Sequence, residues 1–222
     1  LKGAGIDQKG MLEALKIHIE SVGAYGCGIC QEKQGLTLVE EGGAIWLRSH
    51  NQSVIQKGRL CAPDGVIEIQ ADGLYQQGEI SAEGGEICLQ ARKCVQSGEL
   101  RAREIEVKTE GYIEPSSAHL FAPEGTIKIE AGKGRLFTSG RYEAEQGKIE
   151  LTGNEVALCG AKIKAPQGEI SIGGGFQGER QDLRNSLWTY LNGSSEVSAS
   201  GGKIVVWSDG NTEHHGSLKA DF

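Results

Sequence analysis

Thiols are the most reactive side chains in this 222-residue chain, and two of its six cysteines, Cys27 and Cys30, form a Cys-x-x-Cys pair. Such a pair can close a disulfide, cross-link two chains or supply two ligands to a metal ion. A structural zinc site needs four ligands, and the sequence holds no second pair of this kind. We therefore rank plain thiols or a local disulfide first, an intermolecular cross-link second and a metal last, and expect no metal or other cofactor.

Carboxylates are the next candidates for chemistry, because glycoside-cleaving enzymes and calcium sites need them in clusters. Aspartates are scarce and widely separated here, and glutamates are spread along the chain with lysines between them. The adjacent His214 and His215 are interpreted as the surface of a turn rather than as metal ligands. Phosphate-binding loops, nucleophile elbows and zinc-protease motifs do not occur. We predict no catalytic residues and no enzymatic activity.

Aromatic and arginine side chains gather in one glycine-rich stretch, residues 173–193. These residue types dominate the anchors of protein interfaces, and loops on a rigid scaffold often carry function. The stretch predicts a loop that contacts a protein or a glycan. The alternative is that its tryptophan and tyrosine only pack a widened part of the fold. The candidate contact residues are Phe176, Arg180, Arg184, Trp188 and Tyr190.

A repeated phrase, Gly-x-Ile-x-Ile/Leu, indicates the kind of fold that positions these candidate residues. It recurs about every 18 to 22 residues, with one longer step from Ile170 to Ile204. A fixed period in this range indicates a stacked repeat protein. The repeating isoleucines are Ile45, Ile67, Ile87, Ile105, Ile127, Ile149, Ile170 and Ile204, and only Ile105 lacks the glycine before it.

A second phrase, Gly-x-Leu/Ile-x-Ala, lies in each unit and ends in an alanine small enough to let the chain turn a corner. Both phrases alternate apolar and polar residues, which is the period of a half-buried strand. Turn residues such as Pro63-Asp64-Gly65 separate them. The alanines are Ala62, Ala82, Ala102, Ala122, Ala144, Ala165 and Ala220.

Each unit thus has two clear strands and a shorter third strand between them, and it buries its apolar face only by stacking on its neighbours. The sequence predicts an all-β fold, a right-handed parallel β-helix of about eight coils with about 20 residues per coil. We divide this single domain into irregular first coils (1–40), regular repeats (41–172) and an insertion with the final coils (173–222). The insertion is placed around 173–193.

Two parts of this pattern leave alternatives open. Residues 17–19 and 36–38 fit the strands of one wide coil, although residues 10–20 also fit a short helix. The repeating isoleucines and alanines are each expected to stack into an inward ladder. The outward side chains of Glu106, Lys128 and Glu150, next to the isoleucine ladder, alternate in charge. They can pair across coils for about 0.2 to 1 kcal/mol each, but a solvated face is the favoured interpretation.

The charge and hydropathy of the chain limit the classes of partner that it can bind. The net charge is −7, and acidic and basic residues are interspersed without a basic patch. We expect no nucleic-acid partner and no membrane insertion, since no apolar run approaches the ~20 residues of a membrane span. The chain opens without a signal-peptide pattern, and we interpret it as an internal piece of a longer protein.

The C-terminal quarter resembles a known family. The sequences Gly-Gly-Gly-Phe-Gln-Gly (173–178), Val-Val-Trp-Ser-Asp-Gly-Asn-Thr (205–212) and Gly-Ser-Leu-Lys-Ala (216–220) are similar to filamentous haemagglutinin-type exoproteins. These are the large secreted partners of bacterial two-partner secretion. The resemblance covers residues 168–222, whereas the preceding part matches only as generic β-helix repeats.

This resemblance implies a β-helical shaft that leaves the cell through an outer-membrane secretion pore and adheres to host cells or other bacteria. We therefore expect a non-enzymatic segment of a secreted or surface-exposed bacterial adhesin, a virulence factor that contacts a host-cell or bacterial surface protein or glycan. The six cysteines depart from that family. One alternative is a passenger segment of a polymorphic outer-membrane autotransporter, whose Gly-Gly-Ala-Ile motif occurs once, at 42–45. Another is a β-helical polysaccharide lyase or hydrolase.

Overall fold

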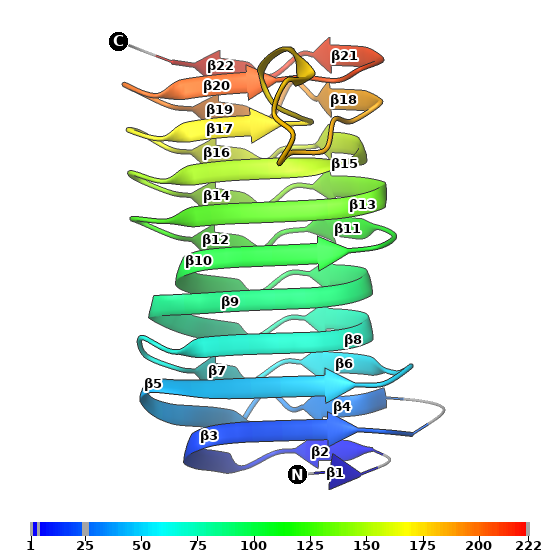
Figure 1. The fold of residues 1–222 in the computed structure, drawn as a ribbon, viewed down its shortest axis with the longest axis vertical. Helices are drawn as coiled ribbons and strands as arrows, with labels where there is room; N and C mark the ends of the chain where they lie inside the picture. The colour runs from blue at the N-terminus through cyan, green and yellow to red at the C-terminus, as the bar shows by residue number, and fades with distance from the viewer. Residues whose placement is uncertain (1, 4, 24–26, 221–222) are drawn as a thin grey trace.

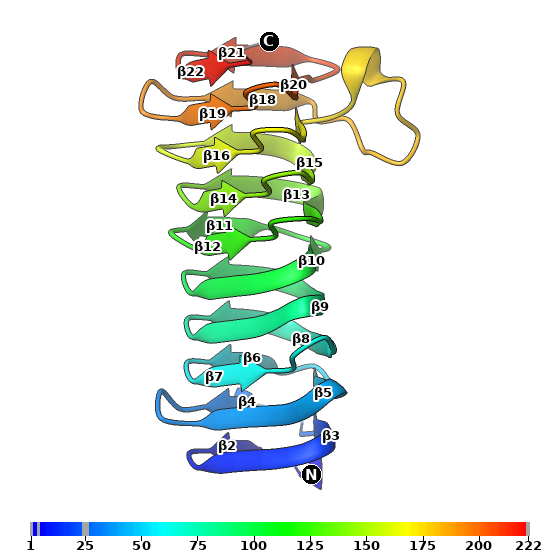
Figure 2. The same ribbon diagram turned by 90° about the vertical axis from the view of Figure 1, so that its left-hand side faces the viewer.

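The chain is a right-handed parallel β-helix of about ten turns, in a computed structural model that describes residues 2–3, 5–23 and 27–220 (Figures 1 and 2). Within these ranges no helix is long and apolar enough to cross a membrane. The described strands are β1 (Lys2–Gly3), β2 (Ile6–Gln8), β3 (Met11–Ser21), β4 (Cys27–Gln31), β5 (Leu36–Ser49), β6 (Ser53–Gln56), β7 (Arg59–Cys61), β8 (Val66–Gln76), β9 (Glu79–Gln96), β10 (Glu99–Thr109), β11 (Ile113–Ser116), β12 (His119–Phe121), β13 (Thr126–Thr138), β14 (Arg141–Glu143), β15 (Lys148–Leu158), β16 (Lys162–Lys164), β17 (Glu169–Ile172), β18 (Trp188–Leu191), β19 (Glu196–Ser198), β20 (Lys203–Val206), β21 (Asn211–His214) and β22 (Ser217–Lys219), with one 3₁₀ turn, η1 (Phe176–Gly178).

Every turn has three faces. Face A carries the Gly-x-Ile phrase, face B carries the short strands, and face C carries the phrase that ends in alanine. Some strands bend around corners without interruption, so β9 contributes to all three faces while β17, β18 and β19 divide one turn between them. All of the described strand pairs are parallel. The backbone therefore bonds from each turn to the next along the whole stack (Figure 1).

The core confirms the predicted ladders. The isoleucines of face A are almost completely buried from Ile45 to Ile170, and each lies in register with the isoleucine of the next turn. The alanines of face C are equally buried from Ala62 to Ala165, whereas Ala220 is exposed in the last described turn. Small alanine side chains at this position let the backbone turn toward face A while the interior stays close-packed.

The first forty residues add two turns, so the β-helix has about ten turns rather than the eight predicted. Ile17 and Ile19 lie on β3 and extend the ladders below Ile45 and Leu47. β3 runs from Met11 to Ser21, so the helix alternative was wrong and the strand prediction is confirmed. Residues 17–19 and 36–38 belong to one wide turn, as expected, because β4 lies between them on face B.

The glycines of the first phrase are required by the close stacking of turns. A Cβ atom added to Gly85 would lie 1.8 Å from the carbonyl oxygen of Gly65 in the turn below. The exception, Arg103, occurs where this corner is shorter: one residue separates Ala102 from Glu104, while three separate their partners Ala82 and Glu86. The shortened corner explains how one turn dispenses with the glycine.

A row of buried glutamines holds the corner between faces B and C, a feature that the sequence did not predict. Gln76 is fully buried; its amide donates to the carbonyl of Gly78 at 2.6 Å and accepts from the backbone N–H of Gly98 at 3.2 Å. Gln56 makes the equivalent contacts one turn earlier. The signal was present as Gln-x-Gly, which recurs at 56–58, 76–78 and 96–98.

Ion pairs link the turns on the outside. Glu106, Lys128 and Glu150 do not pair with one another across the turns of face A. Instead, Glu106 pairs with Lys108 on its own strand at 2.7 Å, and Glu150 pairs with Arg180 at 2.8 Å. Each turn is nevertheless bridged to the next by at least one pair of acidic and basic side chains. Two of these pairs contain a histidine, His50 or His119, and are charged only when its imidazole is protonated. The bridges are Lys2–Glu20, His50–Glu20, Arg48–Glu68, Arg92–Asp72, Arg103–Glu86, His119–Glu143, Arg135–Glu155, Arg180–Glu150 and Lys203–Glu169.

Candidate functional site

Among the described residues, one long loop leaves the β-helix, at residues 173–187 between β17 and β18 (Figure 2). It closes on itself through a bond from the N–H of Ser186 to the carbonyl of Gly173 at 2.6 Å, and Leu187 returns to Asn154 of the preceding turn at 2.8 Å. Gly173 has a φ of +79°, in the left-handed region that favours glycine. The predicted insertion is therefore present, but it is a structured loop that ends before Trp188.

Arg180 fastens this loop to the shaft. Its guanidinium contacts Glu150 of β15 at 2.8 Å and also binds Asp182 within the loop. The hydrogen bond from Arg180 lowers the pKa of the Asp182 carboxyl, and the bond to Asp182 raises the pKa of Arg180 further above its already high ordinary value. Both groups are thus held in their charged forms. The positive charge of Arg180 is paired with carboxylates of the protein itself and is not offered to a partner.

The loop lies over face A of the last turns (Figure 1). Outward side chains of this face are half-exposed in the regular turns, at Glu68 and Lys128 for example. Beneath the loop, the corresponding side chains of Glu150, Ser171 and Val205 have only 7%, 0% and 6% of their surface exposed. The loop therefore covers the outer surface of the shaft rather than extending freely from it.

The five predicted contact residues do not form one patch. Phe176 is 55% exposed at η1, where Lys203 of face A approaches its ring at 5.4 Å. Trp188 and Tyr190 lie on β18 in face B, with their rings stacked 5.4 Å apart. Neither ring packs inside the turn, because both side chains point outward and are half-exposed.

The ring of His215 lies against Tyr190, with 6.0 Å between the ring centroids, and extends the aromatic row toward the next turn. This contact was not foreseen, because His215 and Tyr190 lie in different repeats. Arg184 is exposed on the loop. The site prediction thus divides into two exposed loop residues, Phe176 and Arg184, an internal anchor at Arg180, and an aromatic row on face B.

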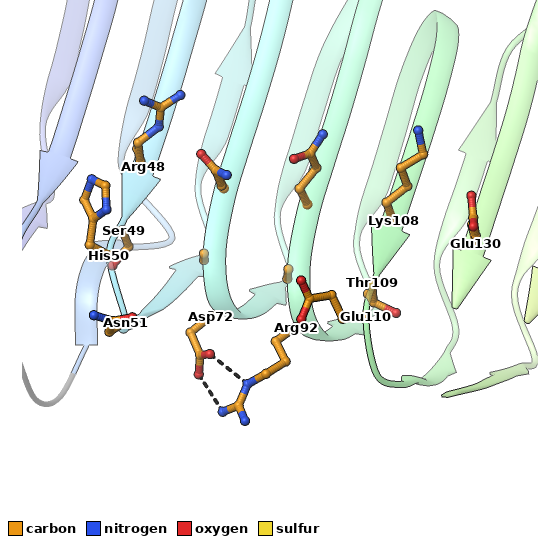
Figure 3. Close-up of a pocket in the computed structure, with 14 residues that line it drawn as sticks. Arg48, Ser49, His50, Asn51, Asp72, Arg92, Lys108, Thr109, Glu110 and Glu130 are labelled. Atoms are coloured by element: carbon orange, nitrogen blue, oxygen red, sulfur yellow. Dashed lines mark hydrogen bonds and ion pairs between the residues drawn. The ribbon is translucent and has the colours of Figure 1, made fainter. Parts of the chain in front are cut away.

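A polar groove of about 560 Å³ runs along the corner between faces A and B (Figure 3). One outward side chain per turn forms its wall, and these side chains are in register from turn to turn. Along its edge, Arg92 binds the carboxylate of Asp72 through two hydrogen bonds of 2.8 and 2.9 Å. The wall residues are Arg48, Gln70, Gln90, Lys108 and Glu130.

Sequence reasoning missed this groove, although a signal was present. Each wall residue directly follows the second apolar residue of the Gly-x-Ile phrase, as Arg48 follows Leu47 and Lys108 follows Val107. The repeat therefore placed them in one row, but only the folded corner shows that this row borders a hollow. Amides and charges at turn spacing can bind a long polar molecule laid along the shaft axis.

The Cys27–Cys30 pair lies on β4, at the opposite end of the shaft from the loop. Burial, together with the neighbouring Cys27 thiol and the acids Glu32 and Asp7, raises the pKa of Cys30 to about 11. Burial also raises the pKa of the thiols of Cys61 and Cys88, which are half-buried. These cysteines are therefore thiols in an acidic or enclosed setting, with little thiolate at neutral pH.

Comparisons with known proteins leave the identity of the chain open: no family model matches it, and no curated protein matches it. The resemblance to filamentous haemagglutinin-type exoproteins therefore stays a prediction, which rests on the residues quoted for it.

Proposed function

We propose that this chain is a non-enzymatic shaft segment of a bacterial adhesin that is secreted or displayed on the cell surface. The observation that supports this best is the unbroken stack: one apolar core runs through about ten turns, every step between turns is bonded through the backbone, and most steps are also bridged by an ion pair. Such a stack resists bending and pulling along its axis, because each turn is held by its neighbours over its whole outline.

The same geometry supports a role in contact. Two outward features differ from the regular surface: the aromatic row of Trp188, Tyr190 and His215, and the exposed ring of Phe176 on the loop. Exposed aromatic rings next to charged groups are common anchors for proteins and glycans. We assign the contact with a host-cell or bacterial surface protein or glycan to this end of the shaft. Export through an outer-membrane pore belongs to the same proposal.

Binding of the whole labelled chain to cultured host cells, to bacteria and to a glycan panel tests the adhesive role. We expect saturable binding that the double variant Trp188→Ala/Tyr190→Ala weakens about tenfold or more. The matched control is Tyr75→Ala, which removes an exposed tyrosine of face B in a regular turn. Absence of binding by a folded, β-rich chain contradicts the adhesive part and leaves a passive shaft.

A second candidate function, polysaccharide cleavage, is favoured by the polar groove alone. The groove is lined by the acidic residues Glu110 and Glu130 and by the basic residues Arg92 and Lys108, and it extends along several turns. Incubation of the chain with anionic and neutral polysaccharides, followed by assays for reducing ends and for unsaturated products, distinguishes the two candidates. Turnover that Lys108→Met abolishes would replace the adhesin proposal with an enzymatic one.

A further inference from the structure

A bulge in β4 turns Cys27 to the outside of the β-helix. Strand residues alternate between the two faces, so Cys27 and Ile29 would both point inward in a regular strand. The pairing with β6 shifts between these residues: Cys27 aligns with Ser53, and Ile29 with the next residue, Val54. Gly28 is therefore an extra residue, and the bulge places Cys27 outside, as it is exposed while Ile29 is buried.

Glycine at the bulge leaves room for the side chain of Ser49. A Cβ atom on residue 28 would lie 1.9 Å from the Oγ atom of Ser49. Bulges frequently re-aim a side chain near a functional site. Here the bulge brings the Cys27 thiol within hydrogen-bonding reach of Cys30, which already points outward.

Two carboxylates converge on the same point. Asp7 lies on β2 directly beside Cys30 in the strand register, so it comes from the preceding turn. Glu32 follows β4, and the Cys30 thiol is 3.8 Å from its Oε1 atom. The ligand atoms of Asp7, Cys30 and Glu32 all lie within 4.8 Å of one another. Lys9 contacts Asp7 at 3.8 Å with a largely exposed side chain, which can move away when a cation arrives.

We propose that Cys27, Cys30, Asp7 and Glu32 bind a divalent, thiol-seeking metal ion of the zinc class. Two sulfur and two carboxylate ligands complete a tetrahedral set, in which donor atoms lie about 4 Å or less apart. Asp7, Cys30 and Glu32 already lie within 4.8 Å of one another, whereas the exposed thiol of Cys27 lies outside this group of three and has to rotate toward it to complete the set. Pure oxygen-seeking cations such as Ca²⁺ and Mg²⁺ fit less well, because half of the donors are thiols.

The site joins two turns of the shaft. Asp7 belongs to the first turn, while the two cysteines and Glu32 belong to the second, which is the wide turn that contains Ile17. A bound ion therefore clamps the first turn to the stack at a place where the core is less enclosed, since Ile6 and Leu12 are only partly buried. This inference stands independently of the adhesive role.

Zinc titration of the whole, freshly reduced chain tests the site, with bound metal measured by elemental analysis and affinity by competition with a coloured chelator. We expect one zinc per chain, and with cobalt alone a thiolate-to-cobalt charge-transfer band. Cys27→Ser and Cys30→Ser should each reduce this band to about half, and the double variant should remove it. Asp7→Asn and Glu32→Gln should keep the band but weaken zinc binding by about tenfold or more. Zinc should also raise the melting temperature of the native chain and leave that of Cys30→Ser unchanged.

Two matched controls come from the regular turns: Cys61→Ser removes a half-buried thiol, and Asp72→Asn removes a carboxylate. Both should bind zinc as the native chain does. The proposal is overturned if the reduced chain binds no zinc, or if the Cys27→Ser/Cys30→Ser double variant binds it equally. Peptide mapping that shows a Cys27–Cys30 disulfide, together with no zinc binding after reduction, would instead support a structural cross-link.

Discussion

The corner between faces A and B is built in two ways, and the contrast shows what fixes this fold. In one turn, residues 152–154 cross it directly between the strand segments of β15. In the next turn, residues 173–187 cross it as the long loop. The strands on either side keep their register regardless: Leu151 still pairs with Ile172, and Glu155 with Trp188. Register is thus set by the ladders and not by the corners.

The physical reason is that a register shift costs much more free energy than a longer loop. A shift of one residue would move every apolar side chain of a strand from the core to the surface. A longer loop adds only a small entropic cost, since loop closure depends on the logarithm of length. The shaft therefore tolerates change at its corners and resists it within its ladders. The predictions below test this contrast.

The largest effect is expected at a glycine of the shaft. Gly85→Ala would place a Cβ atom 1.8 Å from the backbone oxygen of Gly65, and neither turn can move without breaking its ladder. We expect a loss of about 3 kcal/mol or more in the free energy of unfolding, measured by chemical denaturation. Gly10→Ala is the control, because a Cβ atom there meets nothing within 4 Å. Equal loss in both variants would contradict the stacking argument.

A smaller effect is expected at the anchor of the loop. Arg180→Met leaves the carboxylate of Glu150, only 9% exposed in its side chain, without its ion-pair partner. The expected loss is about 2 kcal/mol, with faster proteolysis inside residues 173–187. Arg135→Met is the matched control, since it removes an exposed pair to Glu155 and should change stability by about 0.5 kcal/mol or less. Unchanged proteolysis in Arg180→Met would show that other contacts hold the loop.

Two buried glutamines of the shaft, Gln76 and Gln96, differ in their hydrogen bonds and can be compared directly. Gln76→Leu removes bonds to Gly78 and Gly98, so we expect a loss of about 1 to 2 kcal/mol. Gln96 is equally buried, but its amide has no partner among the residues that the structure describes. Gln96→Leu should therefore be neutral or stabilising in the same denaturation experiment. A loss of similar size in Gln96→Leu would show that its amide is satisfied in solution.

The smallest effect is expected from removing the loop itself. Replacing residues 173–187 with Thr-Gly-Asn, the sequence of 152–154, restores the short corner, and Glu150→Gln avoids an unpaired charge. We expect an intact β-rich circular dichroism spectrum and a loss of about 1 kcal/mol. Glu150→Gln alone is the control. Unfolding of the shortened chain would mean that the loop helps to build the last turns.

The period of the sequence was sufficient to predict the class of fold and the inward ladders, because isoleucine and alanine recur at positions that stack. It undercounted the turns, since the segment around Ile17 lacks the glycine phrase and is followed by a wide turn. For the site, the position of the loop was predictable as a break in the period. The direction of its side chains was not: Arg180 points inward because Glu150 lies beneath it.

The sequence by itself thus determined the repeat, the inward and outward sides of the regular strands, and the place of the insertion, because these depend on local alternation and on spacing along the chain. Only the tertiary structure decided which outward groups meet. The groove joins side chains from five turns, and Asp7 reaches Cys30 across a step between strands, while a bulge at Gly28 reverses the side of Cys27. Such meetings depend on lateral stacking and on backbone irregularities, which a one-dimensional pattern does not contain.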